Sequence, residues 1–398
     1  MNKFILSIAL ACISGLSAHA QFTGKGYYRV QHTGTQRYMS LSDNHSTGVD
    51  LPSNSVDAGA LVTKKNVDEV VTDPGTIFYI ENISGISYNI SAQGANVYNM
   101  INYYVNLSKL NDGTYRAWQT DHGQVLFLSD EDDFYKGKDQ SYVQTIKQTY
   151  KTWYIKPVDT EDNYLGVKPA VESNGKYYAT FFAEFPFSCY STGMKVYYIN
   201  DIKGNGVATY KEITGVVPGK TPVIIECSST DPSQNKLKVE ASSPAAIKDN
   251  KLTGVYFGMG NRDIDHFNCT PFNASTMRVL GVDKDGKLEL NNADTYMADI
   301  MTKKYVSKYN YQYPIVKAIP HNTAYVAVNA ATPTELKLYA DGDPAGIVEI
   351  NQEDSNKPAK IYNLKGMIVK EAATSTEGLP EGIYVFKGKK VVVKSNTI

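Results

Sequence analysis

The chain has 398 residues, which is enough for two or three domains of ordinary size. Its 40 basic and 41 acidic residues leave a formal charge of −1, which excludes the strong positive field that attracts nucleic acid or an anionic membrane. Charged residues at 20% and hydrophobic residues at 42% are typical of a folded protein and exclude a disordered one. Thirty tyrosines, 30 glycines and 16 prolines favour short strands joined by turns, so we expect an all-β fold.

The N-terminal segment 1–20 has the order of an export signal. A charged start precedes an apolar run over 4–16, and Ala-His-Ala fits the small-x-small cleavage rule, so the predicted cut lies between Ala20 and Gln21. The alternatives are a membrane anchor and lipid attachment at Cys12. The apolar run is shorter than the roughly 20 residues that a spanning helix needs. We therefore expect a secreted or outer-surface protein with no transmembrane segment in the mature chain.

Three cysteines remain after this cut, namely Cys189, Cys227 and Cys269. An odd number in an exported chain allows one disulfide and one spare thiol. The alternative is that they pack as small buried apolar groups. They lack the CxxC spacing of metal sites and have few histidines near them, so we predict no metal site and no cofactor.

Residues 21–160 carry a loose aromatic repeat. Tyrosine-rich segments centre on Tyr28, Tyr79, Tyr115 and Tyr154, at spacings of 51, 36 and 39 residues. A second alternating segment follows each of them after about ten residues, as paired strands would. Three units closed by a final strand predict a β-trefoil-like domain, with another antiparallel barrel or meander as the alternative. The pattern of residues 57–71 is the most helical in this region.

The remainder divides into three parts by composition. Residues 161–342 contain long aromatic and β-branched runs, with a hairpin signal at 203–206, and predict an antiparallel β-sandwich. Residues 343–358 are polar and rich in turn formers, which is typical of a linker. Residues 359–398 are short strands broken by glycine and predict a small C-terminal β module.

The C-terminal segment is basic, with eight lysines and three glutamates from Lys357 onward. The charge either protects an exposed sheet edge from aggregation or is read by another protein. A third interpretation is a structural cap that completes the preceding sandwich.

The tail sequence IYNLKG…LPEGIYVFKGKKVVVK resembles the C-terminal sorting module of Bacteroidetes proteins that leave through the type IX secretion machinery. The resemblance implies export machinery as a partner of the tail. The positions that match the pattern are Gly366, Gly382, Tyr384, Gly388, Lys389, Lys390 and Lys394.

Two further resemblances concern the body of the protein. The runs YYATFFAEFPF and AIPHNTAYVAV are similar to a recurring β-sandwich of unknown function in Bacteroidales surface proteins. The run GYYRVQHTGTQRYMSLSDN resembles the first unit of ricin-type trefoils in the same organisms. The Gln-x-Trp motif of ricin-type lectins does not occur in the chain.

The candidate ligand site lies in loops of the trefoil-like domain, because loops on rigid β scaffolds commonly carry function. Its residues are Asp43 and Asn44 after one strand, and Trp118, Gln119 and Asp121 in a hairpin. An aromatic face beside a carboxylate and an amide suits a sugar. The alternative is that Trp118 belongs to the core and the polar residues form turns.

No compact catalytic motif occurs. The chain lacks GxSxG and HExxH, and the segment 215–221 has one residue too few for a phosphate-binding loop. We therefore expect a non-catalytic binding protein for glycans or host proteins. The alternatives are a structural or adhesin component without a small ligand, and a glycan-active enzyme whose site assembles from distant residues.

Overall fold

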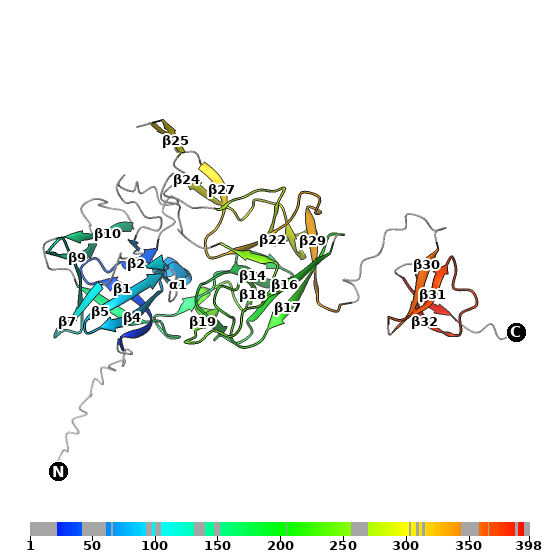
Figure 1. Ribbon diagram of the computed structural model, residues 1–398, viewed down its shortest axis with the longest axis horizontal. Coiled ribbons are helices and arrows are strands. Elements are labelled where there is room, and N and C mark those ends of the chain that lie inside the picture. The colour runs from blue at the N-terminus through cyan, green and yellow to red at the C-terminus, as the bar shows by residue number, and fades with distance from the viewer. Residues whose placement is uncertain are drawn as a thin grey trace, which may run out of the picture.

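The computed structural model describes most of the chain, and strands dominate the described part (Figure 1). Its only helical segments in that part are α1 Val67–Thr72 and the single turns η1 Pro74–Thr76 and η2 Pro232–Gln234. The predicted all-β fold is therefore confirmed. The described residues are 22–41, 61–64, 67–92, 98–99, 105–130, 140–146, 152–203, 205–255, 270–301, 304–307, 310–312, 315–343, 358–364, 366–386 and 389–393.

The strands between residues 25 and 157 form one sheet that closes on itself. Six of its described strands pair antiparallel in the closed order β1–β4–β5–β7–β8–β11 and back to β1, and we call the whole sheet the ring. Strands β2 and β3 continue from β1, and β9 and β10 continue from β8 and meet β3. The bounds are β1 Lys25–His32, β2 Tyr38–Leu41, β3 Leu61–Lys64, β4 Phe78–Ser84, β5 Ser87–Ala92, β6 Tyr98–Asn99, β7 Val105–Lys109, β8 Tyr115–Asp121, β9 Gln124–Asp130, β10 Gln140–Ile146 and β11 Trp153–Pro157.

Alternating side chains fill the inside of the ring. Trp153 is fully buried and donates its indole N–H to the carbonyl oxygen of Leu128, at 3.1 Å. Burial of these apolar side chains supplies the main driving force for closing the ring. The buried members of this core are Tyr28, Val30, Met39, Phe78, Ile80, Ile90, Val105, Leu107, Tyr115, Ala117, Leu128, Trp153 and Ile155.

The helical prediction for residues 57–71 is largely wrong. The segment Leu61–Lys64 is strand β3, paired on both sides by β2 and β10. Only the short α1 follows it, and a helix of six residues depends on packing for its stability. The packing comes from Val70 and Val71, which are both buried.

Residues 165–340 contain several sheets, the largest in the order β13-β14-β18-β16-β17-β29-β23-β22-β28-β20. This region confirms the predicted sandwich-like architecture, although β17 and β29 pair in parallel rather than antiparallel. The bounds are β12 Leu165–Gly166, β13 Val171–Ser173, β14 Lys176–Phe181, β15 Phe187–Cys189, β16 Lys195–Lys203, β17 Val207–Ile213, β18 Val223–Cys227, β19 Lys236–Val239, β20 Leu252–Gly254, β21 Thr270–Pro271, β22 Met277–Val282, β23 Leu288–Asn291, β24 Ala298–Met301, β25 Lys304–Ser307, β26 Asn310–Gln312, β27 Ile315–Ile319, β28 Ala324–Ala327 and β29 Glu335–Ala340.

The central strands of this region are buried on both faces. On β18, Ile224 packs into a cluster with Leu280 and Val326 from the other half of the large sheet. The next residue, Ile225, points to the opposite face and packs with Leu237 of the small sheet β12-β19-β15. Consecutive strand residues point to opposite faces, so β18 has apolar neighbours on both sides.

The ring and the sandwich share a buried junction. The Arg29 side chain is fully buried and donates from Nε to Thr76 Oγ1 and from Nη1 to the carbonyl oxygens of Asn163 and Tyr164. Ile77, which follows η1, lies in the sandwich core. The two regions therefore share apolar contacts and buried hydrogen bonds.

The C-terminal strands form a four-stranded sheet in the order β31-β30-β32-β33 (Figure 1). Its small buried cluster comes from its own residues and includes Ile361, Ala373 and Tyr384. In the part of the chain that the structure describes, no helix is long and apolar enough to span a membrane. The bounds are β30 Ala359–Asn363, β31 Ile368–Ala373, β32 Gly382–Phe386 and β33 Lys389–Val393.

Candidate functional site

Trp118 lies on the outer face of the ring, in the middle of β8. Its neighbour Ala117 points into the core, so strand alternation turns the indole outward. The indole N–H donates to Ser108 Oγ of β7 at 3.0 Å, and this hydrogen bond fixes the plane of the indole. The indole is partly buried, so part of its surface remains available for contact.

Neighbouring strands add polar groups to the same row. Asn106 of β7 is the cross-strand partner of Trp118, and Ser87 of β5 is the cross-strand partner of Asn106. Ser87 Oγ donates to Asn106 Oδ1 at 2.7 Å, which orients the amide. On the other side of Trp118, Phe127 of β9 completes the row. The row Ser87–Asn106–Trp118–Phe127, with Ser108, therefore combines aromatic faces with an amide and hydroxyls.

The other predicted ligand residues do not join this row as a group. Gln119 follows Trp118 on β8 and therefore points to the opposite face of the strand, beside Leu126 of β9. Asp121 ends β8 and pairs with Gln124 across the turn of the β8–β9 hairpin. Asp43 and Asn44 lie outside the described residues.

The sequence did not reveal Ser87, Asn106 or Ser108 as members of the site. They come from strands paired with β8 or β7, and the register of these pairs brings them together. Alternation along each strand could have indicated which side chains face outward. It could not have indicated which ones lie opposite each other.

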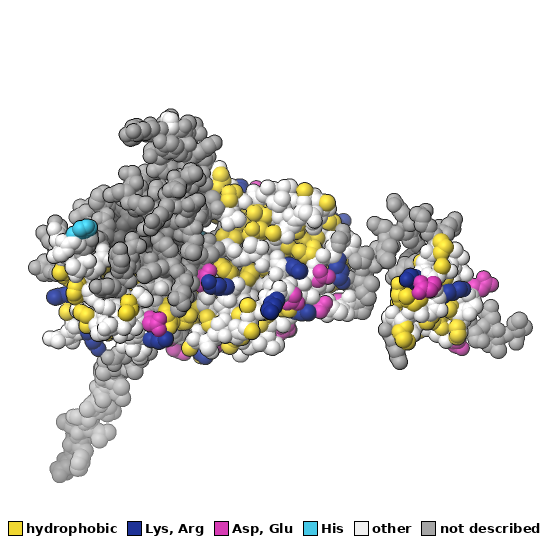
Figure 2. All heavy atoms as spheres, in the orientation of Figure 1, with side chains coloured by type: hydrophobic (Ala, Val, Ile, Leu, Met, Phe, Trp, Pro, Cys, Tyr) yellow, Lys and Arg dark blue, Asp and Glu magenta, His cyan; other side chains and the backbone are white. Residues whose placement is uncertain are grey.

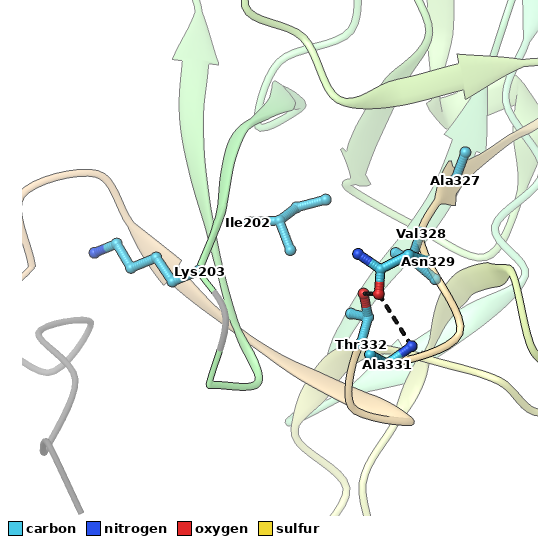
Figure 3. A pocket seen from close by; sticks show the side chains of 7 residues that line it. All are labelled: Ile202, Lys203, Ala327, Val328, Asn329, Ala331 and Thr332. Carbon is cyan, nitrogen blue, oxygen red and sulfur yellow. Dashed lines mark hydrogen bonds between the residues drawn. The ribbon is translucent and has the colours of Figure 1, made fainter.

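A hollow in the described residues lies in the sandwich region (Figure 3). It has a volume of about 560 Å³ and lies between the tip of the β16–β17 hairpin and the segment that follows β28. Asn329 Oδ1 accepts hydrogen bonds from the Ala331 backbone N–H at 3.0 Å and from Thr332 Oγ1 at 3.2 Å, so this side chain holds its own loop. Lys203 is the one ionisable side chain among the described residues that line this hollow.

The two described cysteines, Cys189 and Cys227, are free thiols in or beside the sandwich core. Burial raises the pKa of Cys189 to about 11 and that of Cys227 to about 12. At neutral pH both are protonated, so neither has the thiolate character of a nucleophile. Cys269 lies outside the described residues, and the described part contains no group of three side chains suited to a metal ion.

Part of the predicted sorting pattern can be located in the C-terminal sheet. Gly366 lies in the β30–β31 turn with a φ of 78°, which favours glycine. Gly382 starts β32, and Tyr384 is buried and donates its hydroxyl to the carbonyl oxygen of Pro380 at 3.0 Å. Lys390 is exposed on β33. Lys389 starts β33, and the remaining sorting positions Gly388 and Lys394 lie outside the described residues. The predicted cleavage site between Ala20 and Gln21 also lies outside them.

The C-terminal module exposes several large apolar side chains. Figure 2 shows hydrophobic side chains over this module beside charged ones. The exposed members are Leu364, Met367, Ile368, Val369, Ile383 and Val392.

No family model, no curated protein and no solved structure matches this chain.

Proposed function

We propose that the protein is a non-catalytic carbohydrate-binding protein that acts outside the cell. The observation that carries the proposal is the fixed, partly exposed indole of Trp118 beside the hydroxyls of Ser87 and Ser108, with the Asn106 amide, 7% exposed, accepting from Ser87 beneath them. A sugar presents C–H groups that stack on an aromatic face and hydroxyls that need amide and hydroxyl partners. Ser87 and Ser108 supply such hydroxyl partners beside the indole.

We also assign the ring to the β-trefoil class. Support comes from the six strands in closed antiparallel order and from their grouping along the chain into residues 25–84, 87–109 and 115–157. The first and last groups each contain four strands, of which the inner two form the pairs β2–β3 and β9–β10. The resemblance of residues 26–44 to ricin-type trefoils agrees with this assignment.

Export and surface delivery complete the proposal. The supporting features are the leader of residues 1–20 and the resemblance of residues 359–398 to a type IX sorting module. We propose that the export machinery contacts the C-terminal module, whose exposed apolar residues and lysines suit a protein partner.

A glycan array with the purified protein tests the binding proposal. We expect binding to a defined set of sugars, its loss in Trp118→Ala, and its retention in Ile83→Ala. Ile83 is a matched control because it is an exposed apolar residue of the same sheet, on β4, outside the Trp118 row. No binding by the wild-type protein would favour the structural or adhesin alternative. Release of cleaved sugar during incubation would favour the enzyme.

A further inference from the structure

A second cluster of aromatic and polar side chains lies on the outer face of the ring, where β1, β2 and β11 adjoin. Gln31 of β1 has Tyr38 of β2 as its cross-strand partner on one side and Tyr154 of β11 on the other. The neighbouring residues Val30 and Ile155 belong to the core, so alternation turns Gln31 and Tyr154 outward.

Lys156 of β11 is fixed over this cluster. Its Nζ donates to Gln31 Oε1 at 2.6 Å, and Gln31 Nε2 donates to the carbonyl oxygen of Gln36 at 2.8 Å. The ammonium lies 5.7 Å from the ring centre of Tyr38 and 5.4 Å from that of Tyr154. A cation held between two aromatic rings and one amide loses little further freedom when it binds an anion.

The charge of this ammonium is not neutralised within the described residues. Gln31 accepts one of its three N–H groups, and no described carboxylate forms an ion pair with it. The buried Arg37, in contrast, is paired with Asp130 at 2.8 Å. The cluster therefore presents a positive charge that has only neutral partners among the described residues.

The exposure of the cluster suits a ligand with an apolar face. Tyr154 is 38% exposed, whereas Gln31 beneath it is 7% exposed. The backbone of β11 is fixed next to the cluster, because Asn163 Nδ2 donates to the carbonyl oxygens of Lys156 and Pro157 at 3.1 and 2.6 Å. A rigid support of this kind favours selective binding.

We infer that Tyr38, Tyr154 and Lys156 form a subsite for an acidic sugar residue, one that carries a carboxylate. The carboxylate pairs with Lys156 Nζ through a charge-assisted hydrogen bond, and the sugar ring stacks on Tyr154. This inference rests on the proposed carbohydrate-binding function. It adds a second site, separate from the Trp118 row, and names the class of sugar that this site takes.

The test is calorimetric titration of the purified full-length protein with tetragalacturonic acid and with its methyl ester, which lacks the charge. We expect the acid to bind about tenfold more tightly than the ester, as one charge-assisted hydrogen bond allows. Lys156→Met should remove this preference, so that the acid binds no more tightly than the ester. Tyr154→Ala should weaken the binding of both probes. The matched control is Lys109→Met, an exposed lysine on β7 of the same sheet.

The possible outcomes separate this inference from the proposed function. The subsite is overturned if the wild-type protein binds neither probe, if it binds both equally, or if Lys156→Met keeps the preference for the acid. If Trp118→Ala abolishes binding of both probes while Lys156→Met and Tyr154→Ala leave it intact, the subsite is wrong and the proposed function stands. If binding survives in Trp118→Ala but fails in Tyr154→Ala, the subsite stands and the Trp118 row does not.

Discussion

The ring and the sandwich use their strands in different ways. In the sandwich, Ile224 and Ile225 of β18 pack into clusters on opposite faces, so these strands offer little free surface. In the ring, one face of each strand lines the core, and parts of the other face carry side chains such as Trp118 and Tyr154 that remain partly exposed. Binding surfaces are therefore more to be expected on the outside of the ring, where a side chain can change without loss of the fold.

The largest expected effect is that of a large-to-small substitution in the sandwich core. Phe187 of β15 is fully buried and packs edge-to-face on Phe181 with ring centres 5.1 Å apart. Phe187→Ala should lower the free energy of unfolding by about 3–5 kcal/mol, because it removes apolar contact and leaves a cavity. Urea unfolding measures the loss. Trp118→Ala should cost clearly less, and equal costs would contradict the distinction between the two regions.

The ring should depend on its buried ion pair and not on its exposed one. Arg37 Nε and Nη2 donate to the two oxygens of Asp130 at 2.8 and 3.1 Å, and both side chains are buried. Arg37→Met leaves Asp130 charged and buried, which should cost about 3 kcal/mol in urea unfolding.

The matched control for this prediction is the surface pair Lys25–Glu81. Its atoms are as close, at 2.8 Å, but the side chains are 68% and 40% exposed. Lys25→Met should therefore cost much less than Arg37→Met, because water screens an exposed pair. If Lys25→Met lowers the free energy of unfolding strongly and Arg37→Met lowers it only a little, the buried pair does not stabilise the ring more than the exposed one.

A smaller effect, with a defined pH dependence, is expected at Glu289 of β23. This side chain is buried and accepts from Asn291 Nδ2 at 2.9 Å, and burial raises its pKa above the ordinary value of 4.5. Between 4.5 and the raised pKa, the folded protein holds more protons than the unfolded chain. The contribution of Glu289 to the unfolding free energy therefore falls as pH rises through that window.

Glu289→Gln should consequently unfold at higher urea concentration than the wild type at pH 7.5. The difference should disappear well below pH 4.5, where the glutamate is protonated in both states. Glu172→Gln is the control, because Glu172 is exposed on strand β13 of the same sheet. If Glu289→Gln is equally more stable than the wild type at low pH, burial of the glutamate charge is not the cause of the added stability.

Much of the fold was readable from the sequence because strand formation is largely local. The aromatic segments around Tyr28, Tyr79, Tyr115 and Tyr154 all form strands, and the 203–206 signal marks the β16–β17 hairpin. The pairing was not readable. The Tyr79 segment pairs antiparallel with the Tyr28 segment and with β5, and the spacing of the segments did not indicate either partner.

The candidate site was readable only in part, for the same reason. Trp118 stands out by residue type, but Gln119 follows it on the opposite face of β8. The polar neighbours Ser87 and Asn106 lie 31 and 12 residues away in sequence and meet it through strand register. Lys156 and its two tyrosines come together in the same way. Register depends on the whole sheet, and a single sequence does not reveal it.

The two tryptophans allow the central claim to be tested directly. Trp153 is fully buried in the ring, whereas Trp118 is partly exposed on its outer face, so acrylamide should quench mainly Trp118. With a sugar identified on the array, we predict that saturation protects the fluorescence of the wild-type protein from quenching. Saturation with the sugar should leave the quenching of Trp118→Phe unchanged, because this variant retains only the buried Trp153. Sugar binding that leaves the quenching of the wild-type protein unchanged would contradict the claim that the outer face of the ring at Trp118 is the binding surface.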